Sequence, residues 1–275
     1  MSELTKENID KAISELRKEI KKITISPRAL VKFTNSDEDQ YALTFIDGDK
    51  IGYYLKFIPA ICQKLNLKNI LELGNREGFS TLCIWDHLPK DGSFVSVDIV
   101  KDLRFCPDAM FTDERVRFVY GDVSDPTIYN DNYPRDIDFM FMDTIHYDYQ
   151  ATDEFEVNQY FLADKALVAI DDINFNDKRK FFDRLPYQKW DLTDLCHDSG
   201  WGLFLYERNK LYSYEEKIFE AYKASVKIFT RKYQENEAKL EYINKRKVIT
   251  IIKTLIKKVT PLYKFLIFIR NKIIK

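Results

Sequence analysis

Short apolar runs alternate with stretches of helical periodicity through the middle of the chain. The runs cover 69–74, 94–98, 116–120, 138–143, 166–171 and 203–206. Segments over 51–66, 79–87 and 148–162, which precede or separate these runs, are predicted to be helices. Strands without a polar face, alternating with helices, are typical of a parallel sheet covered on both sides. We therefore predict an α/β domain over residues 51–207.

The two ends of the chain have a different pattern. Residues 3–22 repeat apolar positions at helical spacing, and Pro27 ends the pattern, so residues 1–50 are predicted to form an N-terminal helical cap segment. Residues 213–247 resemble one long helix rich in Glu, Lys and Tyr, and residues 248–274 alternate apolar and Lys positions at helical spacing. The sequence thus predicts three parts: 1–50, 51–207 and a helical extension over 208–275.

Charge is unevenly distributed along the chain. The net charge is −1, but the segment from Tyr242 to Lys275 holds ten basic residues and no acidic one. An acidic body with a basic amphipathic end argues against general nucleic-acid binding. Two interpretations of residues 242–275 stay open: the segment lies on an anionic membrane surface, or its apolar stripe packs on the enzyme body or on a second subunit of a homo-oligomer.

Composition narrows the class of protein and its compartment. Of 275 residues, 45% are hydrophobic and 32% are charged, which is typical of a soluble globular protein and excludes collagen-like and disordered chains. The four cysteines form no CxxC pair, so we expect reduced thiols. The charged N-terminus does not resemble a signal peptide, and no apolar run reaches ~18 residues. We expect a cytoplasmic protein, with peripheral association on the inner membrane face as an open question.

Acidic residues and glycines collect where the predicted strands end. Glu72 with Gly74, then Asp98, Asp143 and Asp171, stand at or beside four strand ends. Because the carboxyl ends of parallel strands meet at one edge of a sheet, these residues are expected to lie together. Parallel sheets bind their ligands at that edge.

The turn after the first strand has the composition of a ligand-binding loop. Gly74 and Gly78 allow close approach of the backbone to a ligand. The helix that follows begins near Ser80 and offers free N–H groups to an anion such as a carboxylate. Asp98 stands 20 residues after Gly78, where a carboxylate can accept ribose hydroxyls. The glycine spacing differs from the G-x-G-x-x-G of a dinucleotide site, which argues against a nicotinamide oxidoreductase.

The order Glu-x-Gly-x-x-x-Gly resembles motif I of the class I S-adenosylmethionine-dependent methyltransferases. The resemblance covers roughly residues 50–206 and implies a Rossmann-like, seven-stranded, mostly parallel sheet with helices on both faces. Gly121-Asp122-Val123 stands where such enzymes frame the adenine. The cofactor-binding residues implied by the loop and the resemblance are Glu72, Gly74, Gly78, Ser80, Asp98, Asp122 and Val123.

Three carboxylates follow two neighbouring strands, in Asp143-Thr144-Ile145-His146 and Asp171-Asp172. Crowded like charges favour a shared cation, and hard oxygen ligands suit Mg²⁺, Mn²⁺ or Ca²⁺. The pattern resembles the cation-dependent small-molecule O-methyltransferases of the macrolide-sugar, cephalosporin-pathway and catechol types. That resemblance implies Asp143, Asp171 and Asp172 as ligands of Mg²⁺ or another divalent cation, and His146 as the catalytic base. We interpret His197 and Asp198 as loop residues.

The function expected from these features is methylation of a hydroxyl on a small molecule, most readily a sugar or sugar nucleotide of a surface-glycan or natural-product pathway. Two alternatives remain. One is a metal-independent methyltransferase acting on a phenol or amine. The other is a non-catalytic, membrane-associated scaffold that keeps the fold.

Overall fold

The computed structural model describes residues 4–23, 53–130 and 132–210. These residues belong to the first of two compact units, residues 1–213. The predicted helices over 213–247 and 248–274, the basic segment from 242 and residues 24–50 of the predicted cap lie outside the described residues.

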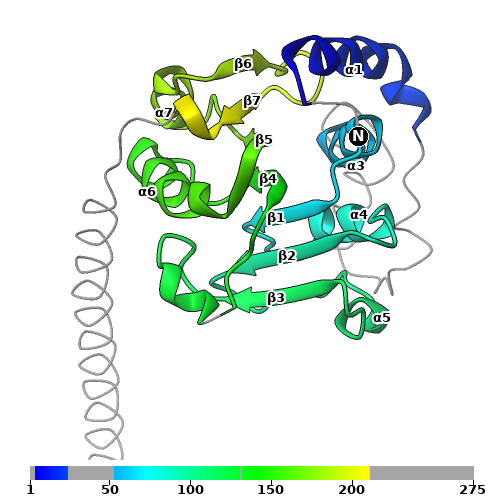
Figure 1. Ribbon diagram of the computed structural model, residues 1–275, viewed down its shortest axis with the longest axis vertical. Coiled ribbons are helices and arrows are strands. Elements are labelled where there is room, and N and C mark those ends of the chain that lie inside the picture. The colour runs from blue at the N-terminus through cyan, green and yellow to red at the C-terminus, as the bar shows by residue number, and fades with distance from the viewer. Residues whose placement is uncertain (1–3, 24–52, 131, 211–275) are drawn as a thin grey trace, which may run out of the picture. The chain divides into compact units, whose positions relative to one another are not determined.

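A seven-stranded sheet forms the centre of the molecule, in the order β3-β2-β1-β4-β5-β7-β6 (Figure 1). Neighbours from β3 to β5 pair in parallel, whereas β7 runs antiparallel to both β5 and β6. The predicted mostly parallel, seven-stranded sheet is thereby confirmed. The strands are β1 Asn69–Leu73, β2 Ser93–Asp98, β3 Val116–Tyr120, β4 Ile137–Met142, β5 Leu162–Asp171, β6 Gln188–Asp191 and β7 Trp201–Glu207.

The chain reverses its direction of travel across the sheet at β1. From β1 it moves outward through β2 to β3, and it then returns to place β4 and β5 on the other side of β1. The loops after β1 and β4 therefore leave the sheet in opposite directions. Such a switch point opens a crevice beyond the carboxyl ends of the two strands, where ligands of this sheet type bind.

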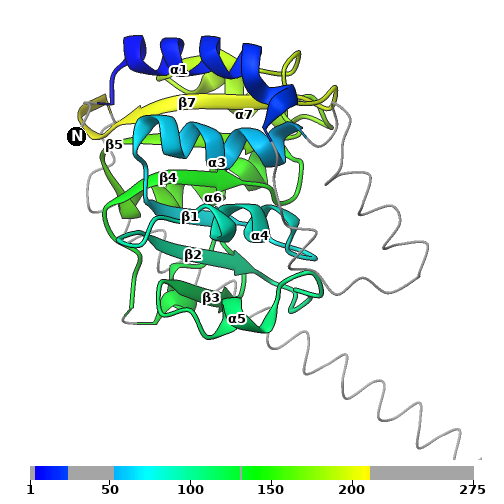
Figure 2. The same cartoon turned by 90° about the vertical axis from the view of Figure 1, so that its right-hand side faces the viewer.

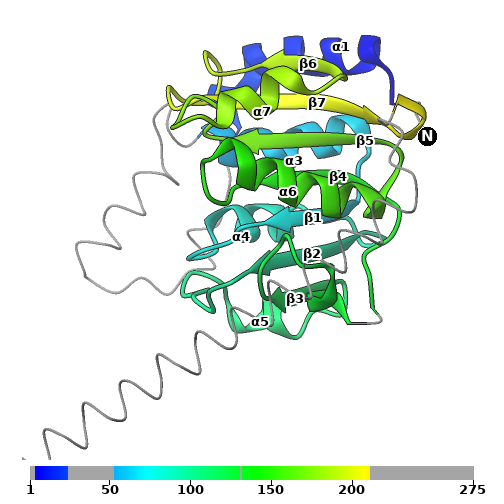
Figure 3. The same cartoon turned by 90° about the vertical axis from the view of Figure 1, so that its left-hand side faces the viewer.

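Helices cover both faces of the sheet. In the two side views α1, α3 and α4 lie on one face (Figure 2), and α6 and α7 lie on the opposite face (Figure 3). The helices are α1 Lys6–Glu19, α3 Tyr53–Leu65, α4 Phe79–Asp86, α5 Asp108–Phe111, α6 Asp148–Asn158 and α7 Lys178–Arg184. Short 3-10 turns occupy Ile20–Lys22, Pro126–Tyr129, Gln159–Phe161 and Arg208–Lys210.

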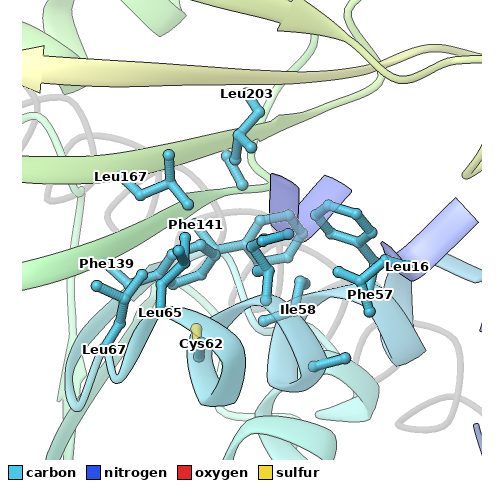
Figure 4. Close-up of a cluster of buried hydrophobic side chains, with 14 of the residues drawn as sticks. Leu16, Phe57, Ile58, Cys62, Leu65, Leu67, Phe139, Phe141, Leu167 and Leu203 are labelled. Atoms are coloured by element: carbon cyan, nitrogen blue, oxygen red, sulfur yellow. The ribbon is translucent and has the colours of Figure 1, made fainter. Parts of the chain in front are cut away.

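The N-terminal helix is part of the main hydrophobic core. Thr5 caps α1 by accepting a hydrogen bond from the backbone N–H of Asn8. Leu16 of α1 is fully buried and belongs to one cluster with Phe57 of α3 and Leu203 of β7 (Figure 4). The first described residues are therefore packed onto the sheet domain through an apolar face.

Two strands differ from the sequence prediction, and the helices α5 and α7 were not predicted. β6 was not expected, because its four residues are polar or only half-buried and it lies at the edge of the sheet. β5 begins at Leu162 and not at the predicted Ala166. The sequence did not indicate this earlier start, because the first residues of the strand, which include Asp164 and Lys165, have no strand-like apolar pattern. Strands that are buried on both faces were found at the expected places, since their apolar runs are continuous.

Among the described residues, no helix is long and apolar enough to cross a membrane.

Candidate active site

A cavity of about 1440 Å³ opens beyond the carboxyl ends of β1, β2, β4 and β5. Pockets for one small ligand measure roughly 300–1,000 Å³, so this one has room for two. Nine of the eleven predicted site residues line it, and the two that do not are Glu72 and Gly78. The nine are Gly74, Ser80, Asp98, Asp122, Val123, Asp143, His146, Asp171 and Asp172.

Gly74 brings the cofactor loop into direct contact with the loop after β4. Its φ of +90° lies in the region that L side chains rarely adopt. A Cβ atom on Gly74 would lie 2.0 Å from the carbonyl oxygen of Asp143. The backbone of Asp143 is held in turn by its N–H, which donates to the carbonyl oxygen of Leu73 at 2.8 Å. Glycine is therefore required at this position for the two loops to meet.

The carboxylate of Asp98 organises the same loop. One oxygen accepts the backbone N–H groups of Asn75 and Arg76, both at 2.8 Å, and the other accepts the N–H of Val100 at 2.8 Å. A carboxylate offers about four acceptor positions. Three are thus used in shaping the loop, and Asp98 retains one for a ligand hydroxyl on the cavity wall.

Glu72 lies beneath the loop instead of on the cavity wall. It is fully buried, and one of its oxygens accepts hydrogen bonds from Thr81 at 2.7 Å and Ser96 at 2.6 Å. Burial raises the pKa of Glu72 to about 7, against the hydrogen bonds of Ser80, Ser96 and Thr81, which lower it. Its visible role is to join the end of β1 to β2 and to the start of α4, and its predicted contact with the cofactor stays a prediction.

Two further predicted residues form the wall beyond β3. The side chain of Asp122 accepts hydrogen bonds from the backbone N–H and the hydroxyl of Ser124, at 2.9 and 2.6 Å. The carbonyl oxygen of Val123 accepts a hydrogen bond from the buried Asn158 of α6 at 2.8 Å. The turn after β3 is thereby fixed against α6.

The predicted acids and the predicted base come together at the ends of β4 and β5. His146 Nε2 lies 3.1 Å from a carboxylate oxygen of Asp172 and 3.9 Å from one of Asp143. Asp172 has a φ of +52°, which is uncommon outside glycine but is tolerated by Asp. Successive residues of a strand point to opposite faces. The positive φ of Asp172 breaks the extended backbone at the end of β5, and both Asp171 and Asp172 line the same cavity.

Two residues of this site were not identified from the sequence. His197, correctly expected in a loop, is only 7% exposed and its Nε2 lies 2.6 Å from Asp171 Oδ1. Tyr54 of α3 lines the cavity and packs edge-on against the His197 ring, with ring centroids 5.2 Å apart. Burial raises the pKa of Tyr54 well above its usual value, and the nearby charges of Asp171 and Asp143 add to this.

Burial and charge crowding act in the same direction on Asp171. Burial and then the charge of Asp143 raise the pKa of Asp171, while His197 partly opposes them. Burial lowers the pKa of His197, but the hydrogen bond to Asp171 and the surrounding acids outweigh it, so the net change is upward. A divalent cation would relieve this crowding, and carboxylate oxygens with an imidazole nitrogen are suitable ligands. The residues present therefore fit a cation.

Glu154 of α6 is a further buried acid on the cavity wall. It is 1% exposed and accepts hydrogen bonds from Thr144 and from Gln150, the latter at 2.9 Å. Burial raises the pKa of Glu154 to about 7, although Thr144, Gln150 and the charge of Lys178 lower it. Glu154 thus fixes the backbone turn that follows Asp143.

Residues 71–173 match the protein family described as a methyltransferase domain. Among solved structures, the chain is similar to a protein described as a candidate caffeoyl-CoA O-methyltransferase from Staphylococcus aureus, at 15% identity and a TM-score of 0.48, over 72% of this chain and 98% of that one. It is also similar to a methyltransferase from Geobacter sulfurreducens, at 16% identity and a TM-score of 0.45, over 63% of this chain and 91% of that one. Likenesses this distant say nothing about the substrate. No curated protein matches the chain.

Proposed function

The chain carries a class I S-adenosylmethionine-dependent methyltransferase domain, and on that premise we propose that it methylates a hydroxyl of a small molecule with the help of a divalent cation. One observation supports this most strongly. The glycine loop that would hold the methyl donor and the acids that would hold a cation line a single cavity, in contact through Gly74 and Asp143. The methyl donor and the acceptor are thus expected to be adjacent.

The side chains that line the cavity would perform three tasks. Asp98 and the start of α4 would bind the ribose and the carboxylate of S-adenosylmethionine. Asp143, Asp171 and Asp172 would hold the cation, which when bound positions neighbouring acceptor oxygens and lowers the pKa of a hydroxyl. His146 would accept the hydroxyl proton, and the carboxylate of Asp172, which lies 3.1 Å from His146 Nε2, would stabilise the resulting imidazolium.

Charge at the site suits the proposed methyl donor. The sulfonium of S-adenosylmethionine is a cation, and the acids near the ends of β4 and β5 favour positive charge in the cavity. The protein's main contributions would be alignment and exclusion of water, which account for much of the rate in reactions of this type.

The rim beside His146 suggests a ring-shaped acceptor. Ile145, Tyr147 and Phe175 are between 42% and 54% exposed, and the Phe175 ring lies edge-on to His146 with centroids 5.4 Å apart. Exposed apolar side chains next to a polar centre can pack on the apolar face of a sugar or another ring while the acids bind its hydroxyls. We propose a sugar or a sugar nucleotide as the acceptor.

The test is methyl transfer from radiolabelled S-adenosylmethionine to a panel of sugar nucleotides, phenols and amines, in Mg²⁺ or Mn²⁺ and in EDTA. The proposal expects label on a hydroxylated acceptor, loss of transfer in EDTA and recovery when metal is restored. Full transfer in excess EDTA would favour the metal-independent alternative. If S-adenosylhomocysteine does not bind, both enzymatic readings fail.

A further inference from the structure

His197 is held at the acid pair by its own loop. It stands between β6 and β7, and its Nε2 lies 2.6 Å from Asp171 Oδ1, while its Nδ1 lies 3.9 Å from Asp172 Oδ1. Both side chains of the closer pair, His197 and Asp171, are more than nine-tenths buried. The ring is therefore placed beside both acids and has little freedom to leave them.

Backbone hydrogen bonds join the His197 loop to the loop of the acid pair. Ile173 N–H donates to the carbonyl oxygen of Gly200 at 3.1 Å, and Asn174 N–H donates to that of Ser199 at 2.8 Å. Gly200 has a φ of +97°, and a Cβ there would lie 2.7 Å from the side chain of Asn174. Only glycine permits this close contact. The two loops thus form one fixed unit that carries Asp171, Asp172 and His197.

The orientation of the imidazole ring is also fixed from the side of α3. The ring of Tyr54 packs against that of His197 at an interplanar angle of 72°. Rotation of the imidazole away from the acids would require Tyr54 to move. Tyr54 is thereby a positioning residue for His197.

The donor atoms of these three residues have the spacing of a cation site. One ligand atom from each of Asp171, Asp172 and His197 lies within 4.8 Å of the others. Asp143 is outside this group, although its charge acts on Asp171. Two carboxylates and one buried imidazole make a mixed oxygen and nitrogen donor set. Imidazole binds first-row transition ions, whereas Mg²⁺ takes oxygen ligands almost exclusively.

We propose that His197 is a nitrogen ligand of the cation, so that the site takes a divalent transition ion such as Mn²⁺, Fe²⁺ or Co²⁺ in preference to Mg²⁺. The inference rests on the proposed function for the existence of a cation and adds the ligand and the class of metal. The proposal gives the two histidines of the site different roles. His197 would hold the ion from the buried side, and His146, 28% exposed in its side chain, would remain available to the acceptor.

The test is pulsed electron paramagnetic resonance of the full-length protein loaded with Mn²⁺, because a directly bound imidazole produces a nitrogen modulation. We expect the modulation in the wild type, and its change when histidine is labelled with ¹⁵N. The matched control is His146→Gln, which removes the other histidine near the acids and should leave the modulation intact. His197→Gln should abolish it and weaken Mn²⁺ binding by roughly tenfold or more, with a smaller effect on Mg²⁺.

The labelled wild type and His146→Gln decide the question even if His197→Gln does not fold. Absence of a histidine modulation in Mn²⁺-loaded wild type would overturn the proposal and leave His197 as a hydrogen-bond partner of Asp171. Loss of the modulation in His146→Gln would overturn it by assigning the ligand to His146. Binding of S-adenosylhomocysteine, measured on the same preparations, reports separately on the methyltransferase function.

Discussion

The backbone of Gly74 lies so close to that of Asp143 that a Cβ on Gly74 would come within 2.0 Å of the Asp143 carbonyl oxygen. The contact joins the loop after β1 to the loop after β4, on either side of the switch point of the sheet. Cofactor site and acid cluster are thus parts of one structure.

Gly74→Ala should damage both sites together. The added methyl group overlaps backbone, which cannot rotate away as a side chain can, and the φ of +90° adds strain. We expect S-adenosylhomocysteine affinity to fall at least tenfold by calorimetry, along with a lower melting temperature. A variant that binds with wild-type affinity would show that the two loops do not meet as described.

Asp98→Asn should weaken cofactor binding by disordering the loop. The amide can accept fewer hydrogen bonds than the carboxylate, which accepts the N–H groups of Asn75, Arg76 and Val100. Loss of charge-assisted bonds of this kind costs about 1.5–3 kcal/mol each, so affinity should fall by about tenfold or more. Asp91→Asn is the matched control, because Asp91 pairs with the Lys68 side chain outside the cavity. This variant should bind S-adenosylhomocysteine with wild-type affinity. Equal affinities in the two variants would remove Asp98 from the cofactor site.

His146→Gln should slow methyl transfer without affecting cofactor binding. His146 faces Asp172 and Asp143 in the acceptor half of the cavity, and loss of a general base typically costs roughly 10²- to 10⁴-fold in rate. We expect kcat to fall while S-adenosylhomocysteine affinity stays within about twofold. A nearly unchanged kcat would place the base elsewhere.

Glu154 should make the protein less stable as the pH rises. Burial raises its pKa from 4.5 to about 7, so the folded protein holds this proton more tightly than the unfolded chain. The contribution to the free energy of unfolding is therefore complete below pH 4.5 and is lost as the pH rises to 7. At about 1.4 kcal/mol per pKa unit the loss is about 3 kcal/mol.

Glu154→Gln, which has no such proton to lose, should flatten this part of the stability curve. Urea unfolding at several pH values between 4 and 8 measures the difference from wild type. Glu156→Gln, on the same helix but only half-buried, should keep the wild-type slope. Parallel curves for wild type and Glu154→Gln would mean that folding does not raise the pKa of Glu154.

The parts of the site that follow strand ends could be predicted, and the parts that depend on loop folding could not. Asp98, Asp143 and Asp171 were located because a run of buried residues precedes each of them, and parallel strands bring such ends together. His197 follows a short polar edge strand, and it reaches Asp171 only because the loop folds back on Asn174. Its one local signal is Gly200, three residues later. Tyr54 has the periodicity of an ordinary core helix, and nothing in its neighbours indicates that it faces the acids.

The central claim is that the methyl donor and the cation share one cavity, and paramagnetic relaxation of the donor's methyl group tests it most directly. S-adenosylmethionine with a ¹³C-labelled methyl would be bound to the protein in Mn²⁺ and, as a diamagnetic control, in Mg²⁺. The account predicts strong relaxation of the methyl signal in Mn²⁺, lost in the Asp171→Asn, Asp172→Asn double variant. If Mn²⁺ and S-adenosylmethionine bind together and the methyl relaxes as it does in Mg²⁺, the two sites are separate and the account is wrong.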